Sequence, residues 1–292
     1  MIYNKSRNIL TVILLFSFFL LTSGFRSARL TYFVKSRILY KGSFFIVVLE
    51  HLDKKKKYRI DFIAGSRTNA YHLKIIRKQT LKLIAIPLGS PDKARLNLVE
   101  NNEIIMQDEF RLLEKPVETV SVEVKQQYVY PPAGLNKQLW QEQQLVQSVK
   151  SILLDKIYFF QTPVRAIAGV TNTSTPFGYK RIFNKSRTNL HFGADLSARA
   201  GTPVHSVFDG VVKLSRELYF TGNTVFVHHG DNLVSLYAHL SKISVTNGQK
   251  IRKGDIVGLV GATGRVTGPH LHLGVFINGL AIDPMSLYEI LK

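Results

Sequence analysis

Cysteine is absent from this 292-residue chain. Without thiols the chain cannot form a disulfide scaffold, a Cys-ligated zinc finger or an iron–sulfur cluster, and it has no cysteine nucleophile. Acidic residues are scarce as well, with 20 Asp and Glu against 39 Lys and Arg, which gives a formal net charge of +19. Such a charge suits nucleic acid, an anionic membrane surface or an anionic polymer outside the cell. Hydrophobic residues make up 45% of the chain, which excludes wholesale disorder.

Charged residues are missing between Arg7 and Arg26, and an apolar run fills residues 9–21 of this gap. A positive start, an apolar run and the small residues at 22–24 are typical of a secretory signal peptide. The uncharged stretch also nearly reaches the ~20 residues needed to cross a bilayer, so an uncleaved anchor in the inner membrane is the alternative. We therefore expect residues 1–28 to be a signal peptide or an N-terminal membrane anchor. The rest of the chain should then be exported to the periplasm or cell envelope, which argues against nucleic acid as a partner.

Residues 29–130 are rich in strand patterns. Apolar, β-branched runs occur at residues 44–49 and 82–88, and residues 119–124 alternate with a period of two. Short runs of this kind with turn clusters between them are typical of a small sandwich-like β domain. Four consecutive lysines at residues 54–57 lie between strand candidates, and we interpret them as a solvent-exposed hairpin tip.

Residues 131–160 have a different pattern. The Pro-Pro-Ala-Gly sequence at 131–134 interrupts the strands, and apolar residues then recur at helical spacing among Gln, Glu and Lys. This spacing predicts one amphipathic connector helix over residues 136–155. Residues 161–292 return to strand patterns and glycine-rich turns. The sequence therefore predicts a mainly β chain with a β-rich N-terminal domain, a linker helix and a C-terminal β domain.

Histidines concentrate in the C-terminal domain, which holds seven of the nine. Two spacings are notable: His191 precedes Asp195 by four positions, and His270 precedes His272 by two. On a β-strand, side chains two or four positions apart share a face, so each pair can point the same way. Gly193 puts no side chain between the first pair. Imidazole nitrogens and one carboxylate that converge on one ion suit zinc, with a fourth position open for water.

An ordered set of motifs spans residues 163–285. It includes TPFGYKR at 175–181, HFGAD at 191–195, YAHLS at 237–241 and TGPHLH at 267–272. This set resembles the LytM/lysostaphin-type zinc metallopeptidases, which cleave peptide cross-bridges of bacterial peptidoglycan. The first motif departs from the family pattern, since Thr replaces its usual Ser and Lys replaces its first Arg.

The resemblance implies both a fold and a site. The fold would be a compact antiparallel β domain of the duplicated-hybrid-motif type, with the site in a groove formed by loops. By their positions in the motifs, His191, Asp195 and His272 would bind one Zn²⁺ per chain. His239 and His270 would be the catalytic histidines that do not bind the metal.

The segment at residues 177–184 resembles the Gram-negative envelope branch of this family. That branch implies an exported D,D-endopeptidase that acts on the peptide stems of peptidoglycan. In some relatives a domain that precedes the catalytic domain covers the active-site groove, and we hypothesise the same latency here. The alternative function is a catalytically inactive family member that activates other murein hydrolases. Such proteins usually lack the zinc ligands, whereas this chain has all three.

Motifs of other hydrolase classes are missing from the chain. It has no HExxH sequence and no GxSxG nucleophile elbow. The glutamates after residue 160 are Glu217 and Glu289, and neither lies in a motif. A histidine must therefore serve as general acid and base, which agrees with the two catalytic histidines that the resemblance implies. We interpret the isolated His205 and His228 as structural.

Overall fold

The computed structural model describes residues 29–33, 39–50, 52–73, 79–152 and 161–291. The expected signal or anchor segment at 1–28 lies outside the described residues, as does the end of the expected helix at 153–155. Within the described ranges, no helix is both long and apolar enough to cross a membrane. The chain divides into two compact units. The first holds the described residues up to Leu39, Phe45–Ile84 and Pro91–Arg111, and the second holds Tyr40–Phe44, Ala85–Ser90 and the described residues from Leu112 onward.

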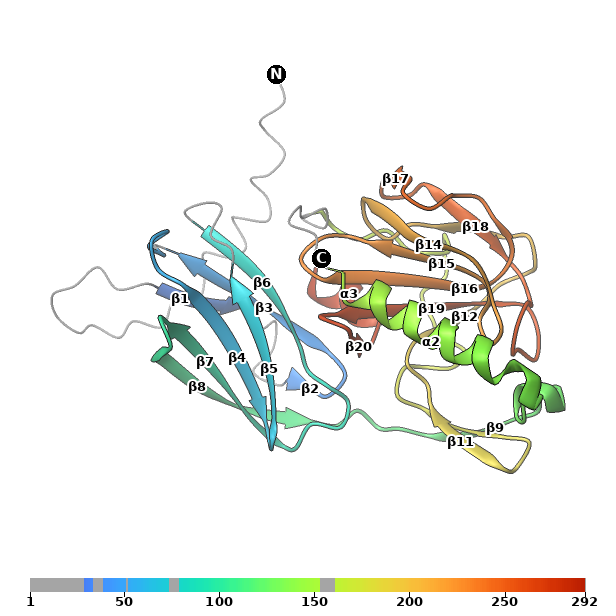
Figure 1. Cartoon of the computed structure of the whole chain (residues 1–292), viewed down its shortest axis with the longest axis horizontal. Coiled ribbons are helices and arrows are strands. Elements are labelled where there is room, and N and C mark those ends of the chain that lie inside the picture. The colour runs from blue at the N-terminus through green and yellow to red at the C-terminus, as the bar shows by residue number, and fades with distance from the viewer. Residues whose placement is uncertain (1–28, 34–38, 51, 74–78, 153–160, 292) are drawn as a thin grey trace, which may run out of the picture. The chain divides into compact units, whose positions relative to one another are not determined.

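The N-terminal strands form two sheets (Figure 1), in the orders β1-β3-β6 and β2-β8-β7-β4-β5. These strands are β1 (Arg29–Phe33), β2 (Leu39–Tyr40), β3 (Phe44–Glu50), β4 (Tyr58–Ala64), β5 (Arg67–Leu73), β6 (Gln79–Ala85), β7 (Lys93–Glu100) and β8 (Glu103–Leu113). Alternate residues of β4 and β7 point inward, so Ile60 faces Leu98 and Phe62 faces Leu96 in a buried core. The lysines at 54–57 lie at an exposed turn between β3 and β4, as the sequence predicts.

The second unit contains the remaining elements. They are β9 (Thr119–Val122), η2 (Gln126–Tyr128), η3 (Ala133–Leu135), α2 (Asn136–Lys150), β10 (Lys180–Phe183), β11 (Arg187–Leu190), β12 (Ala194–Ser197), β13 (Pro203–His205), β14 (Gly210–Leu218), β15 (Gly222–His228), β16 (Leu233–Ile243), β17 (Lys250–Ile251), β18 (Ile256–Val260), β19 (His270–Ile277), β20 (Leu280–Ile282) and α3 (Met285–Ile290). Nine of these strands form one antiparallel sheet whose main path runs β12-β19-β16-β15-β14-β17. The mainly β architecture that the sequence predicts is therefore confirmed.

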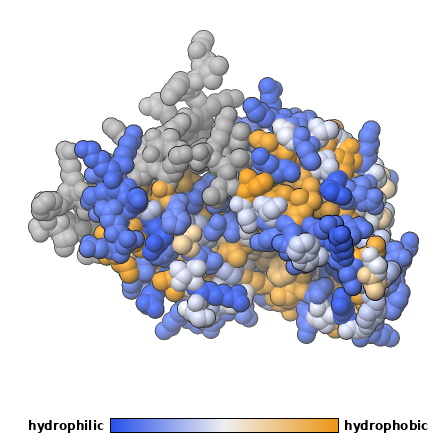
Figure 2. Space-filling model, viewed as in Figure 1, coloured by the Kyte–Doolittle hydropathy of each residue, from blue (hydrophilic) through white to orange (hydrophobic). Residues whose placement is uncertain are grey.

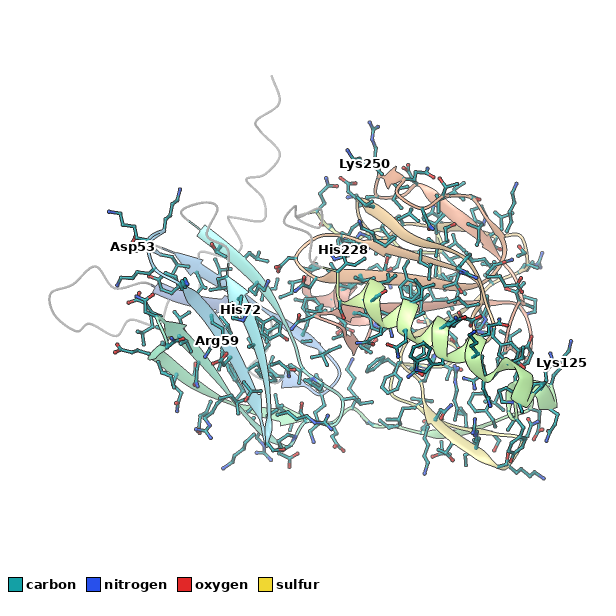
Figure 3. The ribbon with its side chains drawn as sticks, viewed as in Figure 1. Asp53, Arg59, His72, Lys125, His228 and Lys250 are labelled. Carbon is teal, nitrogen blue, oxygen red and sulfur yellow. The ribbon has the colours of Figure 1, made fainter. Side chains whose placement is uncertain are left out.

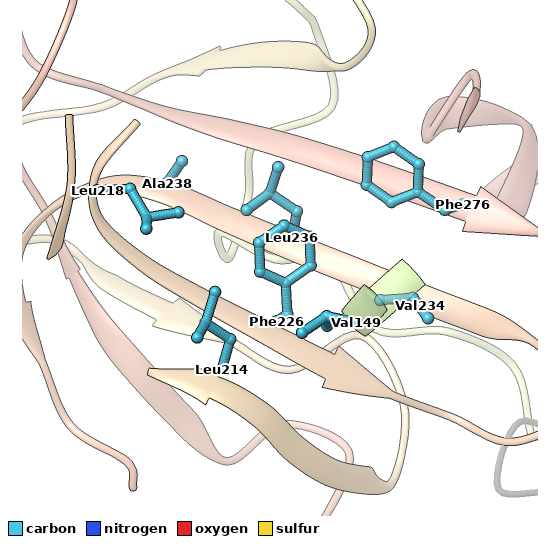
Figure 4. Close-up of a cluster of buried hydrophobic side chains, with 8 residues drawn as sticks. All are labelled: Val149, Leu214, Leu218, Phe226, Val234, Leu236, Ala238 and Phe276. Atoms are coloured by element: carbon cyan, nitrogen blue, oxygen red, sulfur yellow. The ribbon is translucent and has the colours of Figure 1, made fainter. Parts of the chain in front are cut away.

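Helix α2 covers one face of this sheet and completes its core. The buried cluster comprises Val149, Leu214, Leu218, Phe226, Val234, Leu236, Ala238 and Phe276 (Figure 4). Three of these residues alternate along β16, because every second side chain of a strand lies on the same face. Val149 comes from α2, and Leu145 and Val146 pack against the cluster beside it. The helix that the sequence predicts as a connector is therefore part of the second unit's core, and it ends at Lys150.

Strand β9 joins the second unit as well. It pairs in parallel with β10, which in turn pairs with β11. The side-chain amide of Asn184 accepts from Val124 N–H and donates to Val124 C=O, each over 2.8 Å. Asn184 has a φ of 45°, a left-handed conformation that Asn tolerates better than most residues. This amide pair attaches the chain after β9 to the turn between β10 and β11.

Figure 2 shows hydrophilic side chains distributed over the visible face, with hydrophobic residues in patches between them. Several lysines are paired: Lys56 Nζ is 2.7 Å from Glu100 Oε1, and Lys115 Nζ is 2.8 Å from Asp283 Oδ2. The exposed pair of Lys56 and Glu100 contributes little stability, about 0–1 kcal/mol.

Candidate metal centre and active site

Three side chains of the second unit converge on one point. The ligand atoms of His191, Asp195 and His272 all lie within 4.8 Å of one another. His191 Nε2 is 3.0 Å from Asp195 Oδ1 and 3.0 Å from His272 Nδ1. The distance from His272 Nδ1 to Asp195 Oδ1 is 2.9 Å. Two imidazole nitrogens and a carboxylate oxygen at this spacing can hold a metal ion.

The pairing of β12 with β19 sets the position of two of these groups. Asp195 lies directly opposite His272 in the antiparallel register, whereas His270 lies opposite Ser197. His270 and His272 share a strand face, as their spacing predicts. The register therefore places His272 next to the carboxylate and His270 two residue pairs further along the two strands.

His191 reaches the group from outside the strands. The sequence argument that one strand carries both His191 and Asp195 is wrong, because β11 ends at Leu190 and β12 begins only at residue 194. The backbone of His191 pairs instead with the segment before β10: its N–H donates to Tyr179 C=O over 2.9 Å, and its C=O accepts from Gly178 N–H over 2.8 Å. The two residues thus have different backbone partners, and the chain bends between them.

The backbone at Gly193 lies close to the His272 ring. A Cβ at residue 193 would lie 2.5 Å from His272 Cε1, 2.6 Å from His272 Nε2 and 2.6 Å from the carbonyl oxygen of Leu273. Ordinary carbon contacts begin near 3.5 Å, so any side chain here would displace the imidazole ring. The absence of a side chain at residue 193 therefore leaves room for the His272 ring.

Contacts around the group fix its protonation. His191 Nδ1 is 2.9 Å from the carbonyl oxygen of Pro176, so Nδ1–H donates there and Nε2 keeps its lone pair for a metal. Asp195 Oδ2 accepts a charge-assisted hydrogen bond from Arg181. Burial alone would raise the pKa of Asp195, but its polar contacts with His191 and His272 hold that pKa well below its usual range. The carboxylate is therefore ionised at neutral pH.

Two further histidines lie next to this group. The ring centre of His239 is 5.0 Å from that of His270 and 5.9 Å from that of His272. His239 Nδ1 is 2.8 Å from Thr263 C=O, and His270 Nδ1 is 2.9 Å from Gly268 C=O. Each Nδ1–H can donate to its carbonyl oxygen, which leaves Nε2 as a proton acceptor. Burial, with the charges of His272 and His270, lowers the pKa of His239 to about 3.

Strand β16 is irregular where it carries His239. This residue has a φ of 63°, in the left-handed region that few non-glycine residues adopt. The register between β15 and β16 shifts between Asn223 and Val225, and His239 N–H donates to Thr221 C=O over 2.9 Å. Bulges of this kind redirect a side chain and are common beside active sites.

Residues 189–284 match Peptidase family M23. The chain therefore contains a domain that matches this family. All five histidine and aspartate residues around the candidate metal centre lie inside the M23 domain. DD-carboxypeptidase/endopeptidase Mpg of Neisseria meningitidis is 42% identical over 117 residues, which are 40% of this chain and 27% of the relative. Peptidoglycan DD-endopeptidase ShyA of Vibrio cholerae is 45% identical over 100 residues, which are 34% of this chain and 23% of the relative. The matches thus span about a quarter of the length of these curated relatives.

A solved structure shares the fold. The crystal structure of a peptidase M23 from Pseudomonas aeruginosa superposes with a TM-score of 0.61 and covers 85% of this chain and 94% of its own. The two sequences are 24% identical, so this likeness bears on the fold alone. It confirms the antiparallel β fold that the sequence motifs imply.

Two isolated histidines of the M23 domain have structural contacts. His205 Nδ1 is 2.8 Å from the carbonyl oxygen of Gly254. His228 (Figure 3) is fully buried, and its Nε2 lies 2.6 Å from Ile152 C=O, just beyond α2. Both contacts agree with the structural role that the sequence predicts for these residues.

His229 also belongs to a buried network. Its Nδ1 is 2.8 Å from Asp209 C=O, and its Nε2 is 2.8 Å from Ser235 Oγ, which lies 3.0 Å from the Tyr237 hydroxyl oxygen. Burial lowers the pKa of His229 to about 3, so the ring is neutral at pH 7. This network lies among the strands of the M23 core and supports them.

Arg181 is a site residue to which sequence reasoning gave no role. Its guanidinium pairs with Asp195, and the two side chains are 17% and 8% exposed. A buried carboxylate is unfavourable without a partner that stabilises its charge. The signal that could have found Arg181 is its place in the TPFGYKR motif, near an aspartate that needs a cation beside it.

Proposed function

We propose that this chain is an exported, zinc-dependent endopeptidase that hydrolyses peptide cross-links of peptidoglycan, with D,D-endopeptidase specificity. The convergence of His191, Asp195 and His272 in an M23 domain carries this proposal. The names of Mpg and ShyA support the substrate and the bond. Action on peptidoglycan in turn supports a periplasmic or cell-envelope location and the signal or anchor segment at residues 1–28.

The donor set favours zinc among the common metals. Two neutral imidazoles and one carboxylate are three ligands of the kind that catalytic zinc sites use, with a fourth position left for water or substrate. Calcium and magnesium prefer sites made of oxygen ligands. Bound zinc would supply a Lewis acid that polarises a carbonyl group and activates water. The pairing of Arg181 with Asp195 Oδ2 keeps the Oδ1 atom turned toward the two histidines.

We assign the proton transfers to His239 and His270. Each ring donates Nδ1–H to a backbone carbonyl, so each Nε2 can take a proton from the attacking water and return it to the leaving amine. The lowered pKa of His239 keeps its ring neutral near pH 7. Either imidazole, once protonated, could also donate a hydrogen bond to the oxyanion that forms on the carbonyl.

Digestion of cross-linked muropeptide dimers by the full chain with added zinc tests this proposal. Mass spectrometry should show monomer products from cleavage at the cross-link, and a chelator should abolish them until zinc is restored. His272→Ala should remove hydrolysis, whereas His72→Ala, at an exposed histidine of the first unit, should not. Undiminished digestion by His272→Ala would refute the metal assignment. If the folded, zinc-loaded wild-type chain cleaves no cross-link, the inactive activator is the better function.

A further inference from the structure

Three arginines gather beside the candidate metal centre. Arg181 and Arg187 lie on the hairpin of β10 and β11, where Arg187 is directly opposite Phe183. Arg181 and Phe183 are two positions apart on β10, so they share a strand face with Arg187. The third is Arg265, whose guanidinium carbon lies 4.3 Å from the centre of the Phe183 ring. The three positive groups therefore lie on the same side of the hairpin.

The guanidinium of Arg265 is held by aromatic rings. Besides its contact with Phe183, the guanidinium carbon lies 4.9 Å from the centre of the Phe220 ring. The backbone N–H of Arg265 donates to Phe220 C=O over 2.8 Å. Burial and the charges of Arg181 and Arg187 lower the pKa of Arg265 to about 10, so it remains charged at neutral pH. Rings packed against a guanidinium leave the N–H groups at its edge for an acceptor.

Carboxylates are scarce around these positive groups. In the part of the chain that the structure describes, Arg181 pairs with Asp195, but no ion pair joins Arg187 or Arg265 to an acidic side chain. Residues 161–292 contain 14 Lys and Arg but only 7 Asp and Glu. An anion that balances the charge stabilises a partly buried guanidinium beside two other positive groups. The missing anion is therefore expected to come from a bound molecule.

The arginines adjoin the reacting groups from two directions. Arg181 contacts the candidate metal ligand Asp195. Arg265 follows Thr263 by two residues, and the Thr263 carbonyl oxygen is the hydrogen-bond partner of His239 Nδ1. Phe220 precedes Thr221, whose carbonyl oxygen accepts the His239 N–H. A group bound at Arg265 would thus lie close to a bond held at the candidate metal centre.

We propose that Arg187 and Arg265 form a subsite that binds a free carboxylate of the substrate peptide beside the bond to be cleaved. This inference rests on the proposed peptidase function and specifies its substrate as a peptide with a carboxylate near that bond. Guanidinium groups bind carboxylates with paired, charge-assisted hydrogen bonds, and partial burial strengthens such bonds. A cross-linked stem peptide can offer a C-terminal carboxylate or a side-chain carboxylate of an acidic or diamino acid residue.

Kinetics with three cross-linked peptides distinguish these two sources. One peptide has both carboxylates free, one has its C-terminus amidated, and one has its side-chain carboxylate amidated. For the zinc-loaded full chain, we expect amidation of the bound carboxylate to reduce kcat/KM about tenfold to a hundredfold, mainly through KM. With the free peptide, Arg187→Gln and Arg265→Gln should each cause a similar loss of kcat/KM. With the peptide whose bound carboxylate is amidated, the same substitutions should cause almost no further loss. Arg252→Gln, at an exposed arginine of the same domain, should match wild type.

A binding measurement separates this inference from the proposed function. Isothermal titration of the metal-free full chain with the free-carboxylate product peptide should give a weaker Kd for both variants, by about tenfold or more. Arg187 is exposed, so its substitution leaves the fold intact, and near-UV circular dichroism checks Arg265→Gln. If wild type cleaves none of the peptides, the proposed function fails while the titration still tests the subsite. If wild type shows no binding, or if both variants match Arg252→Gln, the subsite is refuted.

Discussion

Substitution of Gly193 by alanine tests whether the close approach of the Gly193 backbone to the His272 ring positions this residue in the candidate metal centre. The added Cβ would lie 2.5 Å from His272 Cε1 and 2.6 Å from the carbonyl oxygen of Leu273. The φ of Gly193 is not in the left-handed region, so alanine meets no backbone penalty there. Any effect of the substitution therefore comes from the steric overlap of the added Cβ, which the His272 ring or the strand must relieve by moving.

The overlap sets the size of the expected loss. Both contacts are about 1 Å shorter than an ordinary carbon contact. Overpacking on this scale costs about 1–3 kcal/mol, which lowers Tm by roughly 2–12 °C for a unit of this size. Leu273 is held by β16 and β12, so relief of the overlap should move both the backbone at residue 193 and the His272 ring. A displaced ligand should weaken zinc binding by about tenfold to a hundredfold.

Zinc affinity and thermal unfolding measure the two effects separately. Competition with a chromogenic chelator gives the zinc Kd, and a thermal melt of the metal-free chain gives Tm. Gly268→Ala is the matched control, because a Cβ at residue 268 meets no atom within 4 Å and its φ is not left-handed. This control should retain wild-type zinc affinity. If Gly193→Ala binds zinc as tightly as Gly268→Ala, the close contact does not position the ligand and the reasoning is refuted.

Three other predictions follow from contacts around the site. Arg181→Gln leaves one oxygen of Asp195 without its cation and should destabilise the metal-free fold by up to about 3 kcal/mol in urea unfolding; an unchanged midpoint would contradict a role for this pair. Asn184→Asp keeps the backbone conformation but loses the donor to Val124, and should lower the free energy of unfolding by about 1 kcal/mol. Burial lowers the pKa of His229 to about 3, so between pH 6.5 and 3 the unfolded chain binds a proton that the folded chain does not. The contribution of His229 to the free energy of unfolding should therefore be present above pH 6.5 and fall by about 1.4 kcal/mol per pH unit on acidification. His229→Gln should make this pH dependence shallower.

The sequence suggested the members of the candidate site but not how they are arranged. The spacing of His270 and His272 correctly predicted two side chains on one strand face. It could not predict which of them meets Asp195, because that depends on the register between β12 and β19, which pairs Asp195 with His272. Periodicity describes a single strand, whereas register depends on the partner strand.

The parts that the sequence did not predict all depend on distant segments. His191 was expected on a strand with Asp195, yet its backbone pairs with residues 178 and 179. The left-handed conformation of His239 arises at a bulge between β15 and β16, and no local motif marks it. Arg181 meets Asp195 across 14 positions in the chain. Propensity and periodicity carry no information about such pairings, so these contacts appear only once the sheet is assembled.

The connector helix changes how latency can be tested. Deletion of residues 30–155 would remove α2 and β9 together with the N-terminal sheets. Val149 fills the core of the second unit, and Glu142 Oε2 accepts the Tyr219 N–H over 2.9 Å at the turn that leads to Thr221. Because the Thr221 carbonyl oxygen holds the His239 backbone, this turn links the helix to a proposed catalytic residue. An inactive deletion variant would therefore report damage to the M23 domain itself, and only a variant that retains α2 and β9 can separate latency from misfolding.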